Sequence, residues 1–145
     1  MWSVPLGRKL LYGEAVARLV GAWVVIKLVP YKVWRSMLGQ PKSISTSDVL
    51  TETSAQIAFD IATLHGVLLR VFGTRFTCLM LALSARGMLK LRGVPSELIL
   101  GVNRNSTNQT ALKLGAHAWV TSGNVKIIGH ETSDKFITVA AYGCY

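Results

Sequence analysis

The sequence predicts an α+β protein in which helices from the first two thirds of the chain pack against strands from the last third. Up to Arg92 the apolar residues recur at intervals of three and four, which is the period of a helix with one buried face. After Pro95 they form short runs separated by polar turns, as strands do. A chain of 145 residues is long enough for one such domain with its own core.

The first helix is expected over about residues 10–28, because Pro30 breaks the apolar period there. A short helix follows from Val33 to Leu38 and ends at Gly39. The segment 40–48 is polar and rich in turn-forming residues, so it is predicted to be a linker. This linker divides the chain into a helical N-terminal segment, residues 1–47, and a main domain, residues 48–145.

Two longer helices are expected in the main domain. One begins after a cap at Ser47 or Asp48 and ends near Gly73. The other begins after a cap at Thr77 and ends at Gly93. This last helix is rich in Leu, Met and Ala on both faces, which predicts that it is central and buried.

Strands are expected in the final third of the chain. The apolar runs 97–102, 116–120 and 125–128 predict one strand and a β-hairpin, whose turn is Ser122-Gly123-Asn124. Residues 136–142 can add a last strand. The strands are therefore grouped after the helices, which indicates the segregated α+β arrangement.

The charge is concentrated near the N-terminus. The whole chain carries 16 Lys and Arg against 7 Asp and Glu, a net charge of +9, with a mean hydropathy of +0.38. Residues 1–47 hold seven of these cations against the single acid Glu14, a net charge of +6. Such a segment favours an acidic partner, an anionic lipid surface or a nucleic acid. It can equally be a solvated face whose lysine and arginine stems cover apolar surface.

The chain is expected to be cytoplasmic. Its most apolar stretch, Leu19 to Val29, contains Lys27 and is too short to span a bilayer, which takes about 20 apolar residues. Glu14 and Arg18 interrupt the region where a signal peptide would be apolar. The two cysteines are too few for a disulfide framework, so a reducing compartment is predicted.

Cys78 and His117 are the best candidates for chemistry. Cys78 directly follows the Thr77 cap, where the unpaired N–H groups and the helix dipole stabilise a thiolate. His117 begins a strand, and a strand histidine facing such a cysteine is the arrangement of papain-like thiol enzymes. The alternative is that both residues only pack. His65 is interpreted as a packing or surface residue, and His130 as an outer group near the site.

Other chemistries have no support in the sequence. It contains no Cys/His spacing typical of zinc, no phosphate-binding loop and no paired carboxylates. Neither a metal nor a cofactor is therefore expected.

Three segments of the chain carry a resemblance to a known family: T-R-F-T-C-L-M-L-A-L (74–83), K-L-R-G-V-P-S-E-L-I-L-G-V (90–102) and A-H-A-W-V-T-S-G-N-V-K-I-I-G (116–129). In this order they resemble the lasso-peptide leader peptidases, which are stand-alone cysteine proteases of the transglutaminase-like superfamily. The resemblance covers about residues 50–142. It implies a transglutaminase/papain-like core, with a central cysteine-bearing helix packed on a small antiparallel sheet.

By this resemblance Cys78 is the nucleophile and His117 its general base. The family's pattern places an aspartate about 12 residues after the histidine, but position 129 of this chain is glycine. Glu131 is the nearest carboxylate and is expected to orient His117. Asp134 and Asn124 are the alternatives for this third role.

The resemblance also implies a set of partners. The substrate would be the leader of a ribosomally made precursor peptide, delivered by a separate small leader-recognition protein. An asparagine-synthetase-like lasso cyclase would then close the ring with ATP. Residues 1–47 are expected to dock the recognition protein and the leader, or to make a peripheral membrane contact, and no nucleic acid is expected. Acyl transfer by the same Cys-His pair and a non-enzymatic scaffold role remain alternative functions.

Overall fold

The computed structural model describes residues 6–38, 40–41, 50–103 and 116–144. Its α-helices are α1 (Leu6–Leu28), α2 (Tyr31–Trp34), α3 (Glu52–Phe72) and α4 (Cys78–Leu91). Three short 3-10 segments accompany them, η1 (Arg35–Leu38), η2 (Gly73–Arg75) and η3 (His130–Lys135). The strands are β1 (Gln40–Pro41), β2 (Ser96–Asn103), β3 (Ala116–Ser122), β4 (Val125–Ile128) and β5 (Phe136–Cys144).

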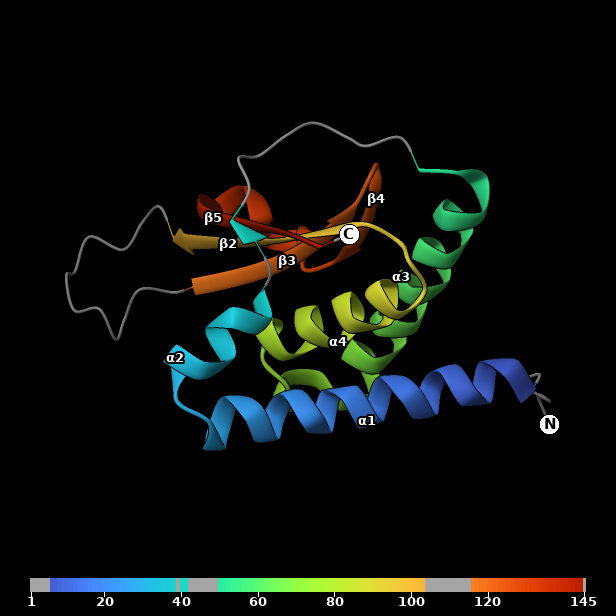
Figure 1. The fold of residues 1–145 in the computed structure, drawn as a ribbon, viewed down its shortest axis with the longest axis horizontal. Helices are drawn as coiled ribbons and strands as arrows, with labels where there is room; N and C mark the ends of the chain where they lie inside the picture. Colours follow the sequence, from blue (N-terminus) through green and yellow to red (C-terminus); the bar gives the residue numbers. More distant parts are fainter. Residues whose placement is uncertain (1–5, 39, 42–49, 104–115, 145) are drawn as a thin grey trace.

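The strands form one antiparallel sheet in the order β1-β5-β2-β3-β4. β2 therefore lies in the middle, between β3 and β5, and the predicted hairpin joins β3 to β4 at one edge. The long helices lie on one side of the sheet (Figure 1). The α+β prediction is confirmed, and the arrangement is consistent with a transglutaminase-like fold.

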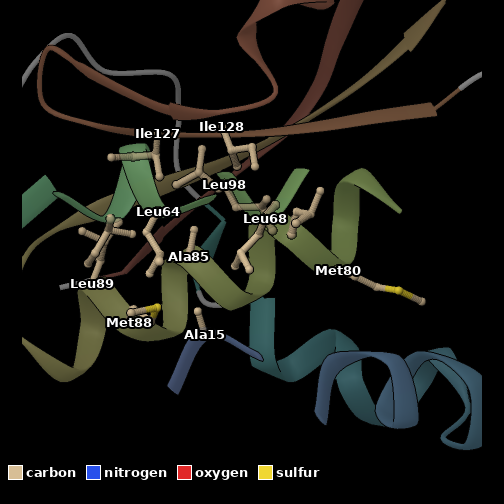
Figure 2. Packing of buried hydrophobic residues seen from close by; sticks show 14 of the residues in the cluster. Ala15, Leu64, Leu68, Met80, Ala85, Met88, Leu89, Leu98, Ile127 and Ile128 are labelled. Atoms are coloured by element: carbon tan, nitrogen blue, oxygen red, sulfur yellow. The ribbon is translucent and has the colours of Figure 1, made fainter. Parts of the chain in front are cut away.

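Helix α4 is the centre of the molecule. It packs against β2 and β3 on one side and against α1 on the other, so it is covered by both the sheet and a second helix (Figure 1). Figure 2 shows Ala85, Met88 and Leu89 of α4 in the core, with Leu98 above and Ala15 below. This double burial explains why both faces of α4 are apolar and confirms that the helix is central.

Helix α3 completes the core from the side. Its buried face carries Ile61, Leu64 and Leu68, and the helix contacts α4 and β4. Within the described part of the chain, α3 is the one helix that is long and apolar enough to cross a membrane by composition. Of this apolar window 28% is buried inside the protein, and the buried side packs in the core.

Two polar groups in the core join distant segments. His65 of α3 is fully buried, and its Nδ1 and Nε2 lie 2.9 Å from the Ile61 carbonyl and 3.1 Å from the Ser84 hydroxyl. The guanidinium of Arg86 on α4 donates to the carbonyl oxygens of Leu38 and Gly143. Arg86 thus connects the end of the N-terminal helices to the last strand.

The sequence-based boundaries need two corrections. The cap of α3 is Thr51, whose hydroxyl accepts from the Ser54 N–H, so the prediction of Ser47 or Asp48 was wrong. Gln40 and Pro41, which were assigned to the linker, pair with β5 as the short strand β1. Isolated two-residue strands have no periodicity of their own, so only the pairing with β5 reveals this one.

The proposed division of the chain at residue 47 lies outside the described residues. Ala15 and Leu19 of α1 belong to the same core cluster as α3 and α4, and both are fully buried. Helix α1 also forms an ion pair with the end of α4, between Glu14 and Arg92. The first helix is therefore packed into the common core.

Candidate active site

Cys78 is the first residue of the central helix. The hydroxyl of Thr77 accepts a hydrogen bond from the Met80 N–H at 3.3 Å, so Thr77 is the N-cap, as predicted. The thiol is free and half-buried. The first turn of α4 contains no acid, so no carboxylate opposes a thiolate there.

The backbone around Cys78 supplies hydrogen-bond donors. By helix geometry, the N–H groups of the first three residues have no acceptor inside the helix. That of Met80 is bound by the Thr77 cap, which leaves the N–H groups of Cys78 and Leu79 pointing out of the helix end. Two adjacent N–H donors beside a thiol can hold a developing oxyanion.

His117 is the second residue of β3, and its ring is fixed by three neighbours. Its Nε2 lies 2.6 Å from the carbonyl oxygen of Gly129. The ring stacks on Phe136, with centroids 4.9 Å apart, and on Trp119, at 5.9 Å. Because a carbonyl oxygen only accepts, Nε2 is the donor and carries the hydrogen. In the neutral ring the lone pair is then on Nδ1, which is the atom that can act as a base.

Cys78 and His117 lie on elements that touch each other. Helix α4 packs against β3. Along β3, Ala118 and Val120 face the helices, whereas Trp119 lies in a small cluster on the opposite face of the sheet. The His117 ring is on this opposite face with Trp119, and none of its described contacts is with Cys78. The catalytic pairing of the two residues stays a prediction.

The three candidates for the orienting group are all exposed. Glu131 and Asp134 lie in η3, and Asn124 lies in the turn between β3 and β4. The contact described for Nε2 is instead with the carbonyl oxygen of Gly129. Glu131 takes no part in this contact, and the contact does not test the role predicted for Glu131.

The main-chain carbonyl of Gly129, which contacts His117, is not among the groups predicted from the sequence. It stands 12 residues after His117, at the place where the family pattern has its aspartate. The β3–β4 hairpin brings it there, because Val120 pairs with Ile128 and the next residue along lies beside Trp119. One feature of the sequence points to this contact: glycine, and not an acid, occupies position 129.

Glycine is required at this position by the local packing. Gly129 has a φ of +84°, which side chains of L-residues rarely adopt. A Cβ there would lie 2.6 Å from the carbonyl oxygen of Ala118 and 3.0 Å from the Trp119 Cβ. No carboxylate can occupy position 129 unless the hairpin moves.

The other two histidines have different surroundings. The Nε2 of His130 lies 3.0 Å from the Val120 carbonyl, and burial lowers the pKa of this histidine. Burial also lowers the pKa of His65, which lies in the core as a packing residue. The described residues contain no group of three side chains suited to hold a metal ion.

Comparison with known proteins decides the family. The family model of the transglutaminase-like superfamily matches residues 25–141, which include α4, strands β2 to β4 and most of β5. The chain belongs to this superfamily. Members are usually cysteine-dependent enzymes, which indicates activity of the cysteine protease or acyltransferase type. No curated protein and no solved structure matches the chain.

The region of this transglutaminase-like protein that matches the family model contains the residues of the candidate site. It begins inside α1 and contains Cys78, His117 and Gly129. Most of α1, the part that precedes residue 25, lies outside it, although that part shares the core through Ala15 and Leu19. The first helix is thus partly an addition to the family domain.

Proposed function

We propose that this protein is a cysteine peptidase that removes the leader from a ribosomally made lasso-peptide precursor. The observation that carries the proposal is Cys78, a free thiol at the capped N-terminus of the central helix in a transglutaminase-like domain. The three motifs that contain Cys78, the Arg-Gly-Val-Pro turn and His117 support the choice of substrate.

In the proposed reaction, Nδ1 of His117 takes the proton of the Cys78 thiol. The thiolate attacks the scissile carbonyl carbon, and the N–H groups of Cys78 and Leu79 bind the oxyanion. The imidazolium returns its proton to the leaving amine, and the core peptide departs. A water molecule, deprotonated by the same imidazole, then hydrolyses the thioester to the leader acid and regenerates the thiol.

Two features of the site suit this chemistry. Cys78 is the first residue of α4, so its thiol stands beside the unpaired N–H groups of the helix N-terminus. The bond from Nε2 to the Gly129 carbonyl keeps the hydrogen on Nε2, so Nδ1 is free of a proton when the ring is neutral. The approach of Sγ to Nδ1 is itself part of the proposal.

The proposed partners are the precursor, a separate small leader-recognition protein that delivers it, and an asparagine-synthetase-like cyclase that uses the product. Peptidase and cyclase must act on the same molecule in turn, because cleavage frees the amine that ring closure consumes. The cytoplasm, where the precursor is made, is the proposed site of action.

The deciding experiment incubates the protein with a precursor and the recognition protein and follows the leader fragment by mass spectrometry. Cys78→Ala is expected to lower the cleavage rate at least a thousandfold, because the nucleophile is lost. Cys144→Ala is the matched control and should cleave normally. Cleavage that survives in the Cys78→Ala variant refutes the proposal.

The same assay separates acyl transfer from hydrolysis. Added amine should leave the mass of the leader fragment unchanged if water is the acceptor. A fragment heavier by the amine identifies an acyltransferase. A separate labelling experiment tests whether Cys78 only packs. A packing role is indicated if the thiol does not react with iodoacetamide at about pH 6, well below the usual thiol pKa of about 8.5.

A further inference from the structure

Helix α1 has a second apolar face that the fold does not use. Its inner face packs into the core through Ala15 and Leu19, and Ala22 and Ile26 continue the same side. The outer face is formed by Lys9, Val16, Val20, Trp23, Val24 and Lys27, all of them exposed. These residues recur at helical spacing, so they form a single stripe on the solvent-exposed side of α1.

The apolar part of this outer face is substantial. Val20 is 49% exposed, Trp23 is 44% exposed and Val24 is 38% exposed. Helix α1 lies at the bottom edge of the molecule in Figure 1, with α4 between it and the sheet. The stripe is therefore on the outside of the protein.

The exposed charged side chains of α1 are all positive. Lys9 and Lys27 are exposed near the two ends of the stripe. The single acid of the helix, Glu14, is turned to the flank, where its carboxylate binds Arg18 at 3.0 Å and Arg92 at 2.6 Å. The Arg92 bond lowers the pKa of Glu14, so this carboxylate stays ionised and neutralised beside α4. No acid of α1 remains to repel an anionic surface.

We propose that the outer face of α1 binds the surface of an anionic membrane. Lysine and tryptophan side chains are suited to a membrane interface, because each combines an apolar body with a polar end. In that position the valines and Trp23 enter the boundary of the acyl chains, and the lysines contact the phosphate groups. The inference does not depend on the peptidase reaction.

A protein partner fits this face less well. Lysine is depleted in protein interfaces, and the outer face of α1 has one at each end. The face is the convex side of one helix, which suits a soft, flat lipid surface. Docking of the acidic surface of a recognition protein is the alternative outcome of the test.

The test measures co-sedimentation of the full chain with vesicles. One set contains phosphatidylcholine alone, and the other contains equal parts of phosphatidylcholine and phosphatidylglycerol. We expect binding to the anionic vesicles, weakened by salt, and little binding to the neutral ones. Binding of soluble poly-glutamate is measured in parallel, because it tests whether the face binds an acidic polypeptide in place of a membrane.

Variants locate the binding face. Val20→Glu with Val24→Glu should weaken binding to anionic vesicles by at least about tenfold, because two apolar side chains no longer enter the lipid. Val71→Glu with Val139→Glu is the matched control, since both valines are exposed and lie on other elements, α3 and β5. Lys9→Gln and Lys27→Gln should each cost up to about fivefold on the anionic vesicles only.

The proposal fails if the wild-type protein does not sediment with anionic vesicles, or if it binds poly-glutamate but not vesicles. It also fails if the control pair on α3 and β5 loses as much binding as the pair on α1. Circular dichroism and thermal unfolding check that each variant is folded. Cleavage of a soluble precursor should persist in the α1 variants, which separates this proposal from the proposed function.

Discussion

Replacing Gly129 by alanine tests whether the hairpin holds His117 as described. Two costs add at this position. An L-residue at a φ of +84° costs about 1–2 kcal/mol. The new Cβ would also lie 2.6 Å from the Ala118 carbonyl oxygen, and because that atom belongs to the backbone, relief requires a shift of the hairpin. Such overpacking typically costs about 1–3 kcal/mol.

The expected loss in the free energy of unfolding is therefore about 2–5 kcal/mol for Gly129→Ala. At about 3 °C per kcal/mol for a domain of this size, the melting temperature should fall by about 6–15 °C. Urea unfolding followed by circular dichroism measures the free energy, and calorimetry measures the temperature. The leader-cleavage rate should fall as well, because the carbonyl that accepts from His117 moves with the hairpin.

Two other glycines provide controls. Gly73 has a φ of +55°, but a Cβ there meets no atom within 4 Å, so Gly73→Ala carries the backbone cost alone. Gly87 is in α4, and its Cβ would meet the far end of the flexible Arg18 side chain, so Gly87→Ala should change stability by less than about 1 kcal/mol. If Gly129→Ala is no more destabilising than Gly73→Ala, the described packing of the hairpin is wrong.

Two further predictions concern the buried polar groups. Because burial lowers the pKa of His65 below 6.5, the unfolded chain binds more protons below that pH. Stability should then fall as the pH decreases through 6.5, by up to about 1.4 kcal/mol per pH unit, and level off above it. Urea unfolding from about pH 5 to about pH 8 measures this slope, which His65→Leu should reduce. Arg86→Leu should cost about 2–4 kcal/mol, because the Leu38 and Gly143 carbonyls lose a charged donor; an unchanged unfolding midpoint would contradict this.

Most of the elements could be predicted from the sequence, because their signals are local. The change of period after Pro95 separated helices from strands, and the position of Thr77 located the start of α4. The cap of α3 was misplaced because several residues between Ser47 and Thr51 can cap a helix, and local sequence does not choose among them.

The candidate site was only partly predictable. Cys78 could be placed at a helix N-terminus from the residues around it, since a cap acts over three or four residues. The face of β3 that carries His117 could not, because the alternation of a strand shows which residues share a face but not which face meets the helices.

By itself, the sequence determined the order of helices and strands, the apolar faces of α3 and α4, and a cysteine behind a cap, because propensity, periodicity and capping act between near neighbours. The tertiary structure alone decided that Gly129 supplies the carbonyl that holds the His117 ring, that Arg86 joins Leu38 to Gly143, and that α1 keeps an apolar face outside. Each of these depends on how separate elements pack, and packing brings together residues that no local pattern relates.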